Sequence, residues 1–159
     1  MKKNVLITVT GIQDGLDPSE DIEMVIPGYY YQKQNKFYII YKESELTGMK
    51  DTTTTIKVER DKVSILRFGK NNSSMIFERG KKHTSHYHTV HGEFMISMLT
   101  KDMKVNLDQE GGQVYVKYAL EVDHMAIGSH SFHVSIRSLT EDYKPFSLTE
   151  EDPIEYPMH

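Results

Sequence analysis

The sequence contains no cysteine in its 159 residues, and it also lacks long apolar runs. The first absence excludes disulfides and thiol catalysis. The second excludes a transmembrane helix, which needs roughly 20 apolar residues in a row. The first eight residues carry two lysines but then alternate polar and apolar side chains, which favours a strand over a signal peptide. We therefore expect a cytoplasmic protein without a membrane partner.

The familiar catalytic motifs are missing too. The sequence has no nucleophile elbow, no phosphate-binding glycine loop followed by a helix, and no His-Glu-x-x-His motif. Serine, histidine and aspartate all occur, but without a spacing that indicates a catalytic triad. We therefore expect a protein that is not an enzyme, and we predict no cofactor.

The composition is that of one globular domain, with 38% hydrophobic and 26% charged residues. The net charge of −4 is unevenly distributed, because residues 140–159 hold six acidic residues and a single lysine. Three of the five prolines also lie in this segment. We predict one domain over residues 1–139, followed by an acidic, proline-containing extension over 140–159 that is loosely docked or disordered.

Alternating polar and apolar residues dominate the rest of the chain. Residues 112–122 show this best, because Val114, Val116 and Tyr118 fall on one face while Gln113 and Lys117 fall on the other. A period of two is typical of a strand with one solvated face. The pattern and its turn residues predict strands near residues 3–12, 22–33, 36–46, 53–60, 63–69, 74–79, 84–90, 93–100, 103–109, 113–123 and 131–139.

Turn residues and changes of parity predict how these strands connect. Gln34-Asn35 fits a tight hairpin, and Gly128-Ser129 is predicted to be a turn before the last strand. Between residues 93 and 109 the apolar positions switch from even to odd, which predicts either a bulge or a short turn. Residues 17–21 carry helix-start signals that allow at most one helical turn.

These elements predict an all-β fold. An open antiparallel sheet would leave two unpaired edges, so we expect a closed antiparallel barrel of about eight to ten strands. The interior of such a barrel is filled by side chains or shared with one small ligand. A functional site is therefore expected among the residues that face inward.

Two inward rows end in opposite charges. The row Phe37, Ile39, Tyr41 ends in Glu43, and the row that begins at Val63 reaches Arg67. Buried charges are costly unless they are paired, so if both point inward they should meet each other, a tyrosine hydroxyl or a polar ligand group. The alternatives are that both charges are solvated or that they form a purely structural ion pair. The candidate ligand-binding residues are Tyr41, Glu43, Arg67 and Tyr118.

Residues 83–91 contain four of the eight histidines. His86 and His88 would project from the same side of a strand, which is one way to begin a zinc site. His83 and His91 would face the other side, so a third ligand would have to come from elsewhere. The alternative hypothesis is therefore a metal-binding barrel or metal-dependent hydrolase that uses His86 and His88, against ordinary strand histidines.

Residues 56–82 carry eight lysines or arginines and three acidic residues. Such an excess could bind nucleic acid or an acidic partner. The simpler interpretation is that these side chains occupy the outer faces and turns that keep a β-rich surface solvated. Binding to nucleic acid is therefore a weaker alternative, and a homo-oligomer or a protein partner stays open.

The chain contains an ordered series of short motifs, which are FYIIYKE (37–43), TTIKV (54–58), VSILRFG (63–69), MIF (75–77), YHTVHG (87–92) and VKYAL (116–120). This series resembles the YwiB-like family of uncharacterised bacterial proteins. The resemblance implies a lipocalin-like, calycin-type β-barrel, and it implies no particular activity, substrate or cofactor. Tyr41, Glu43, Arg67 and Tyr118 fall within the family pattern. We therefore expect a barrel that binds a small amphipathic ligand in its interior or serves as an adaptor.

Overall fold

The computed structural model describes residues 2–11, 23–43, 50–70, 72–89 and 92–139, without the side chains of His88 and Thr89. These residues form ten strands and no helix, and so contain no helix that could cross a membrane. The strands are β1 (Lys3–Thr10), β2 (Glu23–Lys33), β3 (Lys36–Lys42), β4 (Thr52–Val58), β5 (Lys62–Gly69), β6 (Ser73–Glu78), β7 (Lys82–Thr89), β8 (Gly92–Asp108), β9 (Gly111–Val122) and β10 (Met125–Ser138). The helical turn predicted near residues 17–21 lies outside the described residues.

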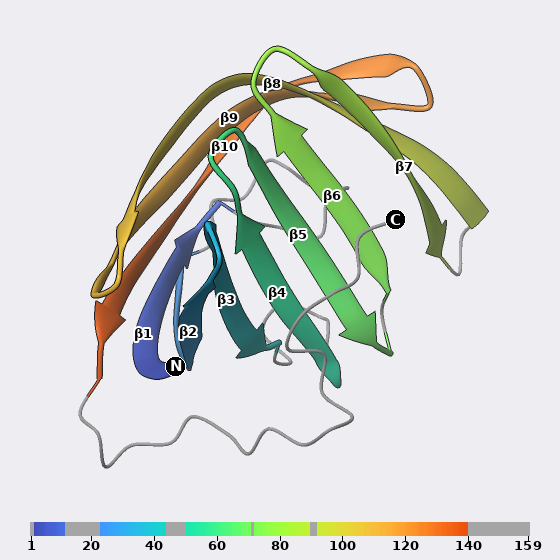
Figure 1. The fold of residues 1–159 in the computed structure, drawn as a ribbon. Helices are drawn as coiled ribbons and strands as arrows, with labels where there is room; N and C mark the ends of the chain where they lie inside the picture. The colour runs from blue at the N-terminus through green and yellow to red at the C-terminus, as the bar shows by residue number, and fades with distance from the viewer. Residues whose placement is uncertain (1, 12–22, 44–49, 71, 90–91, 140–159) are drawn as a thin grey trace.

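All ten strands belong to one antiparallel sheet in the order β6-β5-β4-β3-β2-β1-β10-β9-β8-β7. The first strand pairs with the last, so that Ile7 lies opposite Ile136. Figure 1 shows the long strands β8, β9 and β10 arching over the shorter ones, which brings β7 beside β6. The sheet is therefore rolled into a barrel, and the predicted all-β fold is confirmed.

The closure between β6 and β7 is incomplete. The ladder of backbone hydrogen bonds runs from β6 through the sheet to β7 but does not join these two strands within the described part of the chain. A side-chain bond crosses the junction instead, because the Ser85 hydroxyl donates to the Ser74 carbonyl at 2.6 Å. The barrel is thus nearly closed, as the predicted antiparallel barrel of about eight to ten strands required.

The switch of parity after Thr100 is a bulge rather than a turn. The two strands predicted at 93–100 and 103–109 form the single strand β8, whose register shifts between Thr100 and Asp102. The bulge adds one residue to β8, so the inward positions are even-numbered before it and odd-numbered after it. Met98 and Met103 therefore both face the interior.

The last hairpin differs from the prediction. Strand β10 begins at Met125, and its turn from β9 is formed by Asp123 and His124, with φ of 48° and 69°. Gly128 lies instead at a register shift inside the strand. The predicted Gly128-Ser129 turn is therefore wrong, because residues 125–130 pair through their backbones with β9 while lacking the apolar alternation that marks a strand in sequence.

The predicted inward rows form a hydrophobic core inside the barrel. Its buried apolar members come from β1 through β10, apart from β7, which contributes the half-buried Tyr87. The rings of Phe77, Tyr118 and Phe132 meet across the interior, with centroids 5.0 Å apart for Phe77 and Tyr118 and 5.1 Å for Phe77 and Phe132. Residues from β6, β9 and β10 are thereby joined in one aromatic cluster that stabilises the nearly closed barrel.

Candidate functional site

The inward rows bring a set of polar side chains together at one end of the interior. Tyr41 on β3 lies opposite Thr54 on β4, and Thr54 lies opposite Arg67 on β5. Glu43 follows β3 directly and is fixed by a backbone hydrogen bond to the Thr52 carbonyl at 2.8 Å. Cross-strand register therefore places one carboxylate, one guanidinium and two hydroxyls on the same side of three neighbouring strands.

Both charges of this set are buried. Arg67 is 2% exposed and Glu43 is 7% exposed, so neither is solvated. Arg67 Nε lies 3.8 Å from Glu43 Oε2, and the Thr54 hydroxyl donates a hydrogen bond to the same carboxylate oxygen. The structure thus pairs the two residues as one of the sequence hypotheses required, and it adds Thr54.

The pairing leaves polar atoms of both residues without a hydrogen bond. Among the described residues, Arg67 Nε, Arg67 Nη2 and Glu43 Oε1 are buried and have no hydrogen-bond partner. A separation of 3.8 Å is too long for a hydrogen bond, so the ion pair does not satisfy Nε. Nε and Nη2 form one edge of the guanidinium, the edge that can donate two parallel bonds to one acceptor group. Since buried polar groups are nearly always bonded, this edge is where a further partner fits.

Two tyrosines report the electrostatics of the site. Burial raises the pKa of Tyr41 well above its ordinary value, and the nearby Glu43 carboxylate raises it further while Arg67 opposes the shift. Burial also raises the pKa of Tyr118, on β9, to about 12, with a smaller contribution from Tyr87 and an opposing one from Arg67. The charge of Arg67 therefore acts on hydroxyls from both β3 and β9.

Tyr118 is expected to ionise near pH 12. Because the folded chain holds this proton more tightly than the unfolded chain, with an ordinary tyrosine pKa of about 10, the free energy of unfolding should fall as pH rises from 10 towards 12. Spectrophotometric titration of phenolate absorbance should show one fewer late-ionising group in Tyr118→Phe, whereas Tyr115→Phe on the outer face should leave that step in place. A Tyr118→Phe titration that matches the parent would contradict the assignment.

Comparison with known proteins identifies the family. The model of a domain of unknown function, DUF1934, matches residues 7–134. The chain belongs to the DUF1934 family. It is 31% identical over 124 residues to the uncharacterized beta-barrel protein YwiB of Bacillus subtilis (strain 168). The aligned region covers 77% of this chain and 86% of that protein. The resemblance inferred from the sequence motifs is therefore confirmed.

A solved structure supports the fold of this DUF1934 member. The crystal structure of ywiB protein from Bacillus subtilis superposes with a TM-score of 0.68 at 25% sequence identity, covering 87% of this chain and 94% of that chain. The β-barrel architecture is thus shared with an uncharacterised relative.

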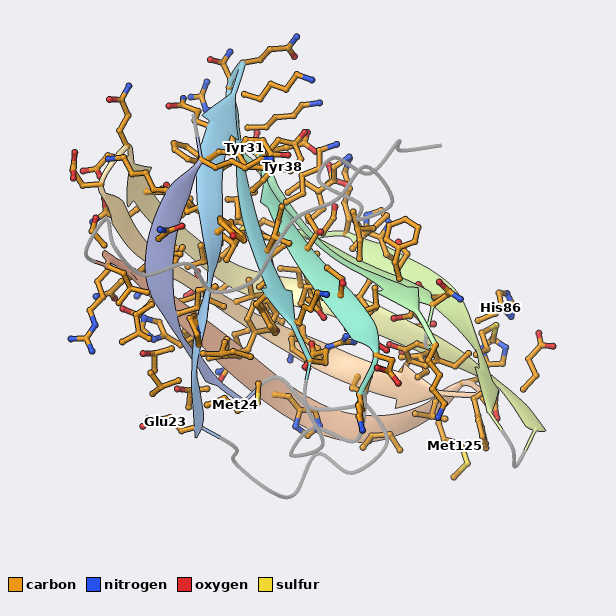
Figure 2. All side chains as sticks on the ribbon, turned by 90° about the horizontal axis from the view of Figure 1, so that it is seen from below. Glu23, Met24, Tyr31, Tyr38, His86 and Met125 are labelled. Atoms are coloured by element: carbon orange, nitrogen blue, oxygen red, sulfur yellow. The ribbon has the colours of Figure 1, made fainter. Side chains whose placement is uncertain are left out.

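Of the two histidines predicted as metal ligands, His86 has an exposed side chain, unlike the buried Arg67. The side chain of His86, labelled in Figure 2, lies at the edge of the molecule in that view. It is 60% exposed, and its Nδ1 lies 3.5 Å from Glu93 Oε1. The side chain of His88 and all of His91 lie outside the described residues. His83 instead contacts Glu78 at 3.1 Å, which lowers the pKa of that carboxyl. No group of three metal-binding side chains occurs among the described residues, so the metal hypothesis stays a prediction without support here.

The basic excess of residues 56–82 is divided between several locations. Arg67 points into the barrel, and Lys57 is buried on the outer side of β4 with 4% exposure. Lys82 is paired with Glu121 at 2.9 Å. Within the described part of the chain these residues do not form one continuous surface, so binding to nucleic acid gains no support and stays a prediction.

Grooves lined by described residues also occur on the outside of this DUF1934 barrel. One of about 410 Å³ lies over β8, β9 and β10 and is lined by Asp102, Lys104, Asn106, Gln113, Tyr115, Lys117 and His133. Another of about 380 Å³ lies near the β4–β5 turn and is lined in part by Arg60 and Arg79. Neither groove contains any residue of the predicted ligand site.

Sequence reasoning missed Thr54, although it is fully buried and bonds to the candidate carboxylate. A signal was present in the sequence, because residues 52–55 are four consecutive threonines and the last three begin the strand predicted over residues 53–60. Alternation requires every second one of them to face the core, where a hydroxyl needs a partner. That requirement pointed to a polar position in the interior before any contact was known.

Proposed function

We propose that this DUF1934 barrel binds a small amphipathic ligand, with the polar head of the ligand at Arg67 and Glu43. The proposal treats the barrel as a lipocalin-like container. The observation that supports it is the buried Arg67 edge, Nε and Nη2, which has no hydrogen-bond partner among the described residues. A buried donor pair of this kind costs stability unless an acceptor occupies it, and a bound ligand would supply that acceptor.

The chemistry of the pair narrows the class of head group. The Arg67 edge suits a carboxylate or another planar acceptor, which it can bind with two parallel hydrogen bonds. Glu43 Oε1 needs a donor, and its negative charge already balances Arg67. A purely anionic head group would therefore bring a second negative charge next to Glu43, and Arg67 could balance only one of the two. The pair instead favours a zwitterionic or neutral head that carries an acceptor and a donor side by side.

The apolar part of the ligand would lie along the aromatic cluster. Tyr118 is electrostatically coupled to Arg67 and its ring contacts Phe77, which in turn contacts Phe132. These rings come from three different strands and offer faces and edges to an alkyl or aromatic chain. Polar recognition at one end and apolar contact along the rest is the usual design of a small-molecule site.

Native mass spectrometry and thermal shift assays test the proposal together. Gently purified protein should retain a non-covalent small-molecule mass. Three probes share an eight-carbon chain: 2-aminooctanoic acid, octanoic acid and octylamine. The zwitterion, 2-aminooctanoic acid, should raise the Tm more than either of the other two. Arg67→Lys should abolish this preference, because lysine keeps the charge but lacks the paired donors.

The matched control is Lys117→Gln, which removes a cation from the outer face of β9 and should bind like the parent. Absence of both a retained mass and any probe-induced stabilisation would contradict the proposal. Stabilisation that survives Arg67→Lys unchanged would place the ligand elsewhere.

A further inference from the structure

The outer face of β3, β4 and β5 is buried, which is unusual for the outside of a barrel. We call this the covered face, and it also includes the outward-pointing Tyr31 near the end of β2. Its outward-pointing residues with at most 8% exposure are Tyr31, Tyr38, Ile40, Thr53, Thr55, Lys57, Ser64 and Leu66. Tyr31 and Tyr38 lie side by side in Figure 2, and their rings stack with centroids 4.7 Å apart. Together with Ile40 they form a second cluster, separate from the core.

Neighbouring side chains within the sheet do not account for this burial. Val25, on the same outward row of β2 as Tyr31, is 56% exposed, and the outward Leu99 on β8 is 37% exposed. The described residues form one rolled sheet and its turns, which provide no second layer over β3–β5. The cover of this face therefore comes from parts of the same chain outside the described residues.

The covered face is both aromatic and basic. Lys33, Lys36 and Lys42 share the outward rows of β2 and β3 with the tyrosines. Lys57 is buried among them, and its pKa is lowered first by burial and next by the charge of Lys36, while Glu59 opposes the shift. An occupant that matches this face would carry apolar side chains together with several carboxylates.

We propose that the C-terminal segment, residues 140–159, docks on the covered face of its own chain. The segment holds six acidic residues and one lysine. Its apolar residues are Tyr143, Phe146, Leu148, Ile154, Tyr156 and Met158. Residues 12–22 also hold four acidic residues, but neither they nor residues 44–49 contain an aromatic side chain, and both stretches are shorter. Acid and aromatic groups on the segment thus complement lysine and tyrosine groups on the face.

The starting point and length of the segment fit this placement. It begins after Leu139, whose backbone N–H donates to the Asn4 carbonyl on β1 at 2.9 Å. Neighbouring strands lie about 4.8 Å apart, so β5 is about 19 Å from β1 across the sheet. Twenty residues extend over as much as about 66 Å at about 3.3 Å per residue, which is ample even for a path with prolines. The docked segment would keep an aromatic patch from associating with other molecules.

Carbodiimide cross-linking of the full chain, read by mass spectrometry, tests the docking directly. Zero-length cross-links should join acidic residues of 140–159 to Lys36 and Lys33 within one molecule. Mixing isotopically labelled and unlabelled protein separates links within a chain from links between copies. Links found only between copies would overturn the proposal in favour of a second copy as the occupant.

A full-length double variant, Phe146→Ser with Leu148→Ser, provides the second measurement. Hydroxyl-radical labelling of Tyr31 and Tyr38 should rise several-fold, while Tyr115 on the outer face of β9 should label as before. Val25→Ser is the matched control and should change none of these. Unchanged labelling of Tyr31 and Tyr38 in the double variant would overturn the proposal. So would increased labelling of these two tyrosines in Leu46→Ser, because residues 44–49 would then be the cover. The outcome is independent of ligand binding inside the barrel.

Discussion

Arg67→Met is expected to lower the free energy of unfolding by about 3–5 kcal/mol, the usual cost of breaking a buried ion pair from one side. The reason is the state of the Glu43 carboxylate after the substitution. Glu43 is 7% exposed, and without Arg67 its carboxylate would keep, among the described residues, only the hydrogen bond from Thr54 and no cation. A buried carboxylate in that state must either stay charged at a high cost or take up a proton. Either route destabilises the folded barrel at neutral pH.

The double variant Glu43→Leu with Arg67→Met is the matched test of this explanation. Removing both charges together leaves no unpaired charge, so the double variant should recover to within about 1–2 kcal/mol of the parent or exceed it. Urea denaturation followed by circular dichroism measures all four corners of the cycle. If the two single losses simply add in the double variant, the ion pair carries no coupling energy and the explanation is wrong.

Phe77→Ala is the second substitution expected to have a large effect, with a loss of about 3–5 kcal/mol. Phe77 is 1% exposed, and its ring touches Tyr118 on β9 and Phe132 on β10. The ring links β6, one border of the incomplete closure, to strands on the far side of the interior. Its loss would leave a cavity and also release β6 from the wall that it faces.

The neighbouring position gives the control. Ile76 lies on the same strand but points outward and is half-buried, so Ile76→Ala should cost about 1 kcal/mol or less. Urea denaturation of both variants compares the two faces of β6 directly. Should Phe77→Ala be too unstable to purify, Phe77→Leu offers a smaller deletion whose loss should still exceed that of Ile76→Ala. Equal losses at residues 76 and 77 would contradict the assigned strand face.

Alternation alone predicted most of the fold. Rows such as Phe37, Ile39, Tyr41 and the row through Val116 and Tyr118 face the interior as expected, because one side of each strand must be removed from water. The bulge near Thr100 was also visible as a change of parity. The start of β10 was not, because residues 125–130 are held by backbone pairing with β9 rather than by a buried face.

The candidate site was predicted in part. The sequence placed Glu43 and Arg67 on inward rows, yet it favoured solvation of both charges at the ends of those rows. Deciding between these outcomes required the register of β3, β4 and β5, which aligns Tyr41, Thr54 and Arg67 across three strands. No local pattern encodes that register over the distance from residue 43 to residue 67.

By itself, the sequence determined the class of fold, the inward and outward rows and the membership of the family, because these depend on the period of two and on ordered short motifs. The tertiary structure alone decided three further features of the part of the chain that is described. Arg67 and Glu43 are buried together with polar atoms that lack hydrogen-bond partners there, β6 and β7 meet without a ladder, and the outer face of β3–β5 is covered. The physical reason is that a repeating pattern fixes which side of a strand avoids water, whereas pairing, closure and coverage depend on contacts between residues far apart in the chain.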